Sequence, residues 1–188
     1  MNLSVYDTLL RDGSQTENLS FSLADKIRIT REFDELGIDY VEGGWPGSNP
    51  KDVEYFNRMK DEELDHTRLT AFGSTRRPDN DPGEDGNLKA LLEAQTPTIT
   101  IFGKSWPLHL TDALDVSEDE NLEMIQSSVR YLSKHDREII YDAEHYFDGF
   151  KDDPDYALTT LKKARDGGAD CLVLCDTNGG CLPREVRE

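Results

Sequence analysis

The sequence predicts an α/β fold, an incomplete (β/α)₈ barrel of the TIM type with about six strand–helix units in residues 1–188. Short apolar segments alternate along the chain with amphipathic segments, which is typical of right-handed βαβ units and a parallel sheet. No GxGxxG pattern follows the first predicted strand, and this disfavours the alternative architecture, an open doubly wound sheet. Polar residues follow every predicted strand, where eight-stranded barrels gather their chemistry.

Six segments rich in Val, Ile, Leu, Tyr, Phe or Thr end at Gly or at an acidic residue, which indicates buried parallel strands. They are residues 3–6, 39–43, 68–73, 98–103, 138–144 and 171–176. A complete barrel needs about 250 residues, so the chain corresponds to roughly three quarters of one. We therefore expect residues 1–188 to be the N-terminal part of a catalytic barrel.

Helical patterns lie between these strands and begin at recognisable caps. Ser22 caps a helix that runs to about Leu36 and ends at Gly37. Ser117 and Glu120 predict a capping box. The other expected helices span residues 49–64, 86–95 and 153–168, and we expect residues 76–86 to form a flexible acidic loop.

The formal net charge of −18 argues against broad binding to a nucleic-acid backbone, which requires basic patches. It fits either an ordinary acidic cytosolic protein or one from a salt-rich cell interior. Neither an apolar run of membrane-spanning length nor a secretory signal is evident, so we expect a cytoplasmic protein without a membrane partner.

The cysteines Cys171, Cys175 and Cys181 are odd in number and cluster in one region. Their spacing does not match the CxxC pairs of zinc sites, and a disulfide framework is disfavoured. We expect small buried or half-buried thiols.

The first polar cluster follows the first strand, where Arg11 and Asp12 precede Gly13. Asp is a hard oxygen ligand for divalent metals, and Arg offers a rigid fork of donors for an enolate or carboxylate oxygen. Taken alone, the pair favours a surface salt bridge over a functional site. Glu42, at the end of the second strand, is expected to point toward the same end of the barrel.

The second cluster follows the fifth and sixth strands. The two-residue period of a strand places Asp142 and Glu144 on one face, and a carboxylate in a closed pocket can act as an acid or base. His145 is either a base or ligand, or an ordinary polar loop residue. Thr177 precedes two glycines and could hold a small carboxylate with nearby backbone N–H groups.

Five stretches resemble the pyruvate-carboxyltransferase-like barrel enzymes, a family that includes isopropylmalate, homocitrate and citramalate synthases and hydroxymethylglutaryl-CoA lyase. They are DTLLRDGSQ (7–15), DYVEGGWPGSNPKD (39–52), TIFGKSW (100–106), YDAEHYFDGFK (141–151) and CDTNGG (175–180). The resemblance spans nearly the whole chain. The second and fourth stretches look most like the bacterial citramalate synthase branch.

The resemblance implies a Claisen-type condensation of acetyl-CoA with pyruvate, within the biosynthesis of branched-chain amino acids such as isoleucine. It implies that Asp12 is a ligand of Mg²⁺, Mn²⁺ or Zn²⁺. Arg11 and Glu144 are the implied catalytic residues. The implied substrate-binding residues are Arg11, Gln15, Glu42 and Thr177.

The sequence departs from the family pattern in one respect. The resemblance implies further metal ligands, a His-x-His pair and an Asn, and these have no counterpart in residues 1–188. We therefore expect this chain to be inactive alone and a longer form to be a homodimer. Other keto acids, as in isopropylmalate or homocitrate synthase, or the lyase direction, would use the same residues. A non-catalytic interaction subunit is the alternative from another class.

Overall fold

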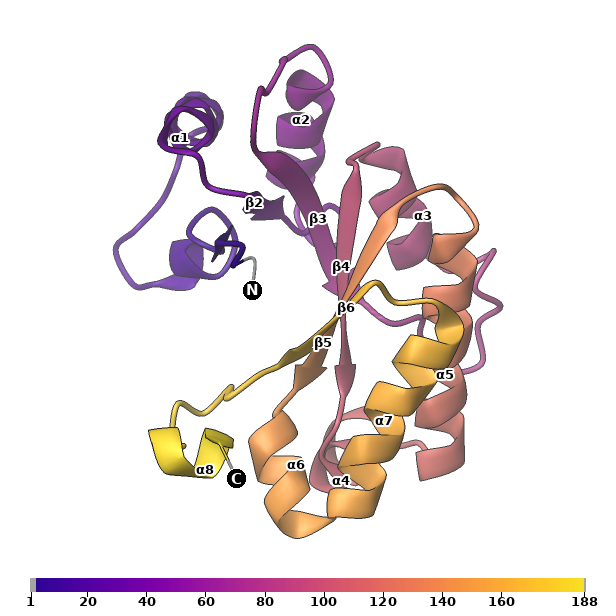
Figure 1. Cartoon of the computed structure of the whole chain (residues 1–188). Coiled ribbons are helices and arrows are strands. Elements are labelled where there is room, and N and C mark those ends of the chain that lie inside the picture. The colour runs from indigo at the N-terminus through magenta and orange to yellow at the C-terminus, as the bar shows by residue number, and fades with distance from the viewer. Residues whose placement is uncertain (1–2, 188) are drawn as a thin grey trace. The chain divides into compact units, whose positions relative to one another are not determined.

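A computed structural model describes residues 3–187 and contains six strands that alternate with helices along the chain (Figure 1). The strands are β1 (Tyr6–Asp7), β2 (Tyr40–Gly44), β3 (Arg68–Ser74), β4 (Thr98–Lys104), β5 (Glu138–Glu144) and β6 (Cys171–Leu174). The longer helices are α1 (Leu23–Leu36), α2 (Pro50–Met59), α3 (Gly86–Glu93), α5 (Glu118–Ser133) and α7 (Pro154–Gly167). The shorter ones are η1 (Gly13–Gln15), α4 (Pro107–His109), η2 (Leu110–Leu114), α6 (Tyr146–Asp152) and α8 (Pro183–Arg187).

The strand order decides between the two architectures that fit the sequence. The strands follow one another in the order β1-β2-β3-β4-β5-β6, and the β1–β2, β2–β3 and β5–β6 pairs are parallel. A doubly wound sheet would reverse its strand order at a switch point, whereas a barrel adds each strand beside the previous one. The fold is therefore the predicted incomplete TIM-type barrel with six of its strands.

The chain divides into two compact units. Unit 1 comprises residues 1–73 and 86–100, and unit 2 comprises residues 74–85 and 101–188.

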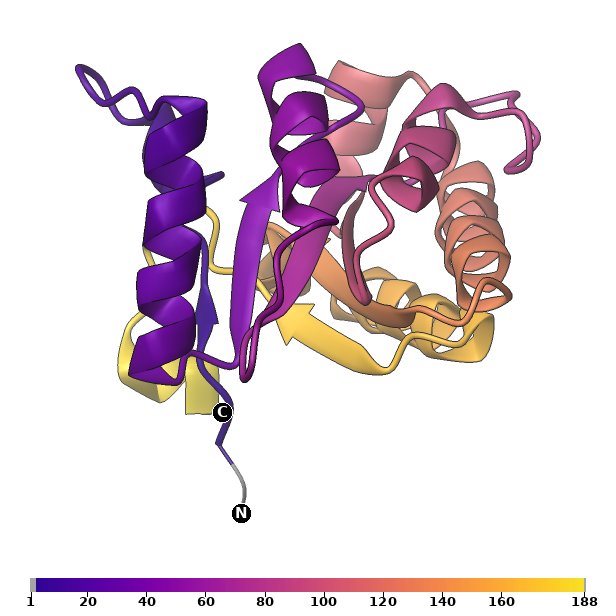
Figure 2. The ribbon, with the colours of Figure 1, turned by 90° about the horizontal axis from the view of Figure 1, so that it is seen from above.

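Unit 1 is organised around β2, which α1 and α2 both contact; these two helices also lie against each other (Figure 2). The side chains of Val41, Tyr55 and Phe56 are almost completely buried and form part of its core. A complete capping box between Ser22 and Asp25 starts α1, and Gly37 ends it in the left-handed conformation at φ 76°.

Unit 2 is built on β5 and β6, with α7 packed against α5, α6 and both strands (Figure 1). Its core includes Ile125, Val129, Ile139 and Tyr141, each with no exposed surface. The strand β6 is an edge of the sheet, and Val173 and Leu174 on it are exposed.

The structure corrects several boundaries. The first strand begins at Tyr6 rather than at residue 3, and the second helix ends at Met59 rather than at residue 64. The strand predicted over 171–176 ends at Leu174. Helices η1, α4, η2 and α6 were not predicted, because each spans only two turns or fewer and leaves little periodicity to detect. The short helix α8 confirms the helix start predicted at Pro183.

Two further expectations concern side-chain surroundings. Cys171 is exposed rather than buried, because it lies on the edge strand; Cys175 and Cys181 are half-buried as expected, and all three thiols are free. The segment 76–86 lacks strands and is held by Asp85, whose buried carboxylate accepts hydrogen bonds from Arg77 N and Asn80 Nδ2. No helix within residues 3–187 is long and apolar enough to cross a membrane.

Candidate active site

In unit 1, a tight turn after β1 places Arg11 beside Glu42. The carbonyl oxygen of Thr8 accepts hydrogen bonds from the backbone N–H groups of Arg11, Asp12 and Gly13. This turn directs the Arg11 side chain to β2, where its Nε donates to Oε1 of Glu42 at 2.5 Å. The predicted pair of neighbours, Arg11 and Asp12, also forms a salt bridge, with Nη1 3.0 Å from Oδ1. Arg11 therefore bridges a buried carboxylate, that of Glu42, and an exposed one, that of Asp12.

Glu42 is completely buried, and each of its carboxylate oxygens accepts a hydrogen bond. Oε1 receives Arg11 Nε, and Oε2 receives the hydroxyl of Tyr6 at 2.6 Å. Burial raises the pKa of Glu42 above its usual value, while the Arg11 charge and the Tyr6 and Arg11 hydrogen bonds oppose this rise. This geometry fits a residue that holds Arg11 in place better than one that contacts substrate directly.

The Arg11 guanidinium also lies over the ring of Phe72, with its central carbon 3.8 Å from the ring centroid. A cation over an aromatic face is stabilised by the ring quadrupole, more so where water is partly excluded. The Arg11 side chain is 18% exposed. It is therefore fixed on one edge by Glu42 and on one face by Phe72, while part of its surface stays accessible.

Asp12 and Gln15 are exposed members of the same turn, and the Asp12 side chain is 61% exposed. Exposure leaves Asp12 accessible to a cation. However, residues 3–187 contain no group of three or more His, Cys, Asp or Glu side chains that could hold a metal ion. One carboxylate is not a sufficient ligand set for Mg²⁺, Mn²⁺ or Zn²⁺. The described residues therefore do not fit a complete metal site.

In unit 2, the strand ends of β4 and β5 bring Lys104 and Glu144 together. Lys104 Nζ donates to Glu144 Oε2, and both side chains are partly exposed. Asp142 and Glu144 have the same intermediate exposure, whereas Tyr141 and Ala143 between and beside them are buried, as the strand period predicts. Glu144 is therefore an ion-paired carboxylate at a strand end.

Thr177 lies beside the residue that follows β5. The backbone N–H of His145 donates to Oγ1 of Thr177 at 2.9 Å. His145 can aim this N–H because its backbone adopts the left-handed conformation, with φ 54°. Since the Thr177 oxygen accepts this bond, its own hydroxyl hydrogen remains available for donation to a carboxylate.

Sequence reasoning missed His109, which pairs with His145. Their ring centroids are 4.5 Å apart in an edge-to-face arrangement, and Trp106 contacts both rings. Burial, followed by the charges of His145 and Lys104, lowers the pKa of His109 below its usual value. His145 Nδ1 is also 3.3 Å from Asp148. The sequence did contain one indication of His109. Pro107 follows the end of a predicted strand and favours a helix start there, which would place His109 near the predicted site.

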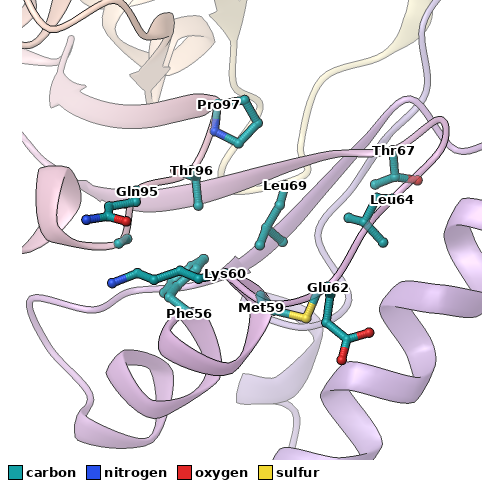
Figure 3. A pocket seen from close by; sticks show the side chains of 11 residues that line it. Phe56, Met59, Lys60, Glu62, Leu64, Thr67, Leu69, Gln95, Thr96 and Pro97 are labelled. Carbon is teal, nitrogen blue, oxygen red and sulfur yellow. The ribbon is translucent and has the colours of Figure 1, made fainter.

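A pocket of about 210 Å³ in unit 1 lies away from these residues (Figure 3). Its walls come from the last turn of α2, the segment after it, and the residues that precede or begin β3 and β4, including Phe56, Met59, Thr67, Leu69 and Pro97. Active sites of TIM barrels lie at the carboxyl ends of the strands, and this pocket lies at the amino ends. We therefore assign it no catalytic role.

Comparisons with known proteins agree with the fold and the motifs. The HMGL-like family model matches residues 2–188. An (R)-citramalate synthase from Aquifex aeolicus (strain VF5) is 56% identical over 184 residues, which are 98% of this chain and 35% of that relative. A probable 2-isopropylmalate synthase from Methanopyrus kandleri is 31% identical over 97% of this chain and 34% of the relative.

A solved structure of hydroxymethylglutaryl-CoA lyase from Pseudomonas aeruginosa has a TM-score of 0.72, with 19% identity over 98% of this chain and 62% of that one. This likeness supports the fold. The chain spans about a third of the length of the curated relatives it matches. Because the family model covers nearly all of the sequence, the chain belongs to the HMGL-like family.

Proposed function

We propose that this chain is part of a citramalate synthase, which condenses acetyl-CoA with pyruvate. The observation that carries the proposal is the 56% identity to an (R)-citramalate synthase over almost the whole chain, against 31% for a probable 2-isopropylmalate synthase. The geometry of Arg11 supports it, since a guanidinium held by Glu42 and Phe72 is preorganised positive charge.

In the proposed reaction, a base removes a proton from the acetyl methyl group, and the resulting carbanion attacks the keto carbon of pyruvate. A carbon–carbon bond forms, the keto π electrons move to oxygen, and that oxygen takes up a proton. Water then hydrolyses the thioester to give citramalate and free CoA thiol. Negative charge grows on oxygen in both enolate formation and attack, so a fixed cation lowers the barrier.

Each predicted residue has a proposed role. Arg11 binds the keto oxygen and stabilises its developing charge, and Glu42 holds Arg11. Thr177 donates its hydroxyl to the pyruvate carboxylate, and Glu144 acts as an ion-paired carboxylate in proton transfer. Gln15 contacts substrate from the exposed end of its turn.

Asp12 is a proposed single ligand of a divalent metal whose other ligands lie outside the described residues. A bound metal would supply Lewis acidity toward the keto oxygen. Residues 3–187 hold no complete ligand set for such a metal. For a full-length form we expect a cytoplasmic location and a homodimer. Light scattering tests the oligomeric state.

The test compares this chain with a full-length form in an assay of CoA thiol release with acetyl-CoA, pyruvate and Mn²⁺. We expect release by the full-length form, citramalate as the product, and little release by residues 1–188. A panel that includes 2-oxoisovalerate and 2-oxoglutarate separates citramalate synthase from its relatives. Preference for a keto acid other than pyruvate would contradict the proposal, and so would release of pyruvate from citramalate without condensation.

A further inference from the structure

The Gly-rich segment EGGWPGSN, residues 42–49, runs from the last residues of β2 to the cap of α2. Two polar side chains of unit 1, Asp52 and Asn87, approach its backbone closely. A Cβ atom on Gly44 would lie 2.4 Å from Asp52 Cγ. A Cβ atom on Gly47 or Gly73 would lie 2.7 or 2.9 Å from Asn87 Oδ1. A side chain at any of the three positions would therefore force Asp52 or Asn87 to shift, and glycine permits their close approach.

Both polar side chains hold the same residue, Trp45. The Asp52 carboxylate accepts from the Trp45 backbone N–H at 2.9 Å, and Asn87 Oδ1 accepts from the indole Nε1–H at 2.8 Å. Asp52 is itself fixed by a buried salt bridge, with Lys26 Nζ 2.6 Å from Oδ1. The backbone and the ring of Trp45 are therefore restrained independently.

Trp45 in turn supports the platform under Arg11. Its ring packs edge-to-face on Phe72, with centroids 5.7 Å apart, and Phe72 carries the Arg11 guanidinium at 3.8 Å. The angle between the Trp45 and Phe72 rings is 85°, a favoured arrangement for aromatic pairs. A shift of the indole would therefore change where Phe72 and Arg11 lie.

We propose that Asn87 is a positioning residue for Arg11, acting through Trp45 and Phe72, with Asp52 holding the backbone of Trp45. A contribution of Asn87 to catalysis rests on the proposed condensation. The positioning of Arg11 by Asn87 is independent of it. Of these residues, the sequence pointed only to Arg11. The contacts join α3, the β2–α2 segment, β3 and the turn after β1, and contacts between distant segments leave no local pattern in the sequence.

The test uses Asn87→Leu, which removes the acceptor at similar volume, and Asn87→Asp, which keeps an acceptor for the indole. In ¹⁵N-labelled chain, two resonances report the contacts without any activity: the Trp45 indole N–H, identified by its loss in Trp45→Phe, and the Arg11 Nε–H, identified by its loss in Arg11→Lys. We expect Asn87→Leu to move both resonances and Asn87→Asp to leave the Arg11 resonance close to its original position.

In the full-length form, we expect Asn87→Leu to lower kcat about tenfold while KM for pyruvate changes by less than about threefold, because misplacement of Arg11 weakens transition-state stabilisation most. Asn87→Asp, which keeps an acceptor for the indole, should have a kcat close to that of wild type. Thr67→Val is the matched control: it removes a side-chain hydrogen bond to Ile38 O at the amino end of β3. It should destabilise the protein without the selective loss in kcat.

An unchanged Arg11 resonance in Asn87→Leu overturns the proposal, as does an equal fall in kcat in Asn87→Leu and Thr67→Val. If the full-length protein lacks condensation activity, the proposed function fails. The two resonances then still decide whether Asn87 positions Arg11.

Discussion

Arg11 Nε donates to the completely buried carboxylate of Glu42 at 2.5 Å, so a cation that reaches the surface is held by an anion that does not. The buried carboxylate fixes the direction of the guanidinium, while 18% of the Arg11 side chain stays accessible to solvent. Removing one partner of such a pair leaves the other uncompensated.

We first predict the effect of Glu42→Gln. Gln keeps an acceptor for Arg11 and removes the charge, so we expect kcat of the full-length form to fall about tenfold through weaker positioning. The stability of wild type relative to Glu42→Gln should fall as pH rises. The pKa of Glu42 is raised in the folded state, so its stabilising contribution is complete below about 4.5 and is lost as pH rises through the folded value.

Urea unfolding of wild type and Glu42→Gln between pH 4 and pH 8 measures this difference. The advantage of wild type over the variant should shrink with rising pH across this range. Parallel pH profiles for the two proteins would show that Glu42 has an ordinary pKa and would contradict the prediction.

A second prediction concerns Gly44, whose φ is 153° and whose Cβ position is occupied by the Asp52 carboxylate. Gly44→Ala should lower the free energy of unfolding by about 3 kcal/mol through strain and overpacking. Gly86→Ala is the matched control in the same unit, because no heavy atom lies within 4 Å of its Cβ position. Chemical denaturation of both variants checks this, and equal losses would contradict the steric account.

A third prediction concerns Asp34, whose carboxylate accepts from the backbone N–H groups of Asp65, His66 and Thr67 at 2.7–2.9 Å. Burial alone would raise the pKa of Asp34, but these donors together lower it below 3.8. Asp34→Ala should cost roughly 2 kcal/mol at pH 7, because the hydrogen bonds to a charged acceptor are lost.

This difference between wild type and Asp34→Ala should be complete above about pH 3.8 and should decline as pH falls through the lower folded pKa. Asp34→Asn keeps one acceptor oxygen and should lie between the two. Unfolding curves at several pH values measure the effect. A stability difference that grows on acidification would be incompatible with a lowered pKa.

A fourth prediction concerns the two imidazoles of unit 2. His145→Asn removes a charge that lowers the pKa of His109, and Asn tolerates the left-handed backbone at this position. The pKa of His109 should therefore rise toward its usual value. Asp112→Asn should move it in the opposite direction, since Asp112 raises it. Titration of the His109 ring resonances by NMR tests both, and a fall in His145→Asn would refute the pairing.

The fold was largely predictable because its signals are local. Apolar strand segments, the Ser22 cap and the Gly37 stop each depend on neighbouring residues, and the structure confirms them within a few positions. Short helices such as α4 and α6 escaped because so few residues carry no reliable period. Cys171 was misjudged because exposure of a strand depends on its place in the sheet.

The candidate site was predictable only in part. The motif stretches pointed to Arg11, Asp12, Glu42, Glu144 and Thr177, because residues after parallel strands gather at one end. The partners of these residues, including Tyr6, Phe72 and His109, have no motif of their own. Their proximity arises from contacts between segments 30 or more positions apart, such as Tyr6 with Glu42.

The sequence by itself determined the family, the six-strand rhythm and the residue types available for chemistry, because these are encoded in local pattern and motif. Only the tertiary structure decided that Glu42 is buried beneath Arg11 rather than accessible, and that Asn87 reaches Trp45. Burial and long-range hydrogen bonds are properties of packed segments, and packing is set by the three-dimensional approach of residues that are distant along the chain.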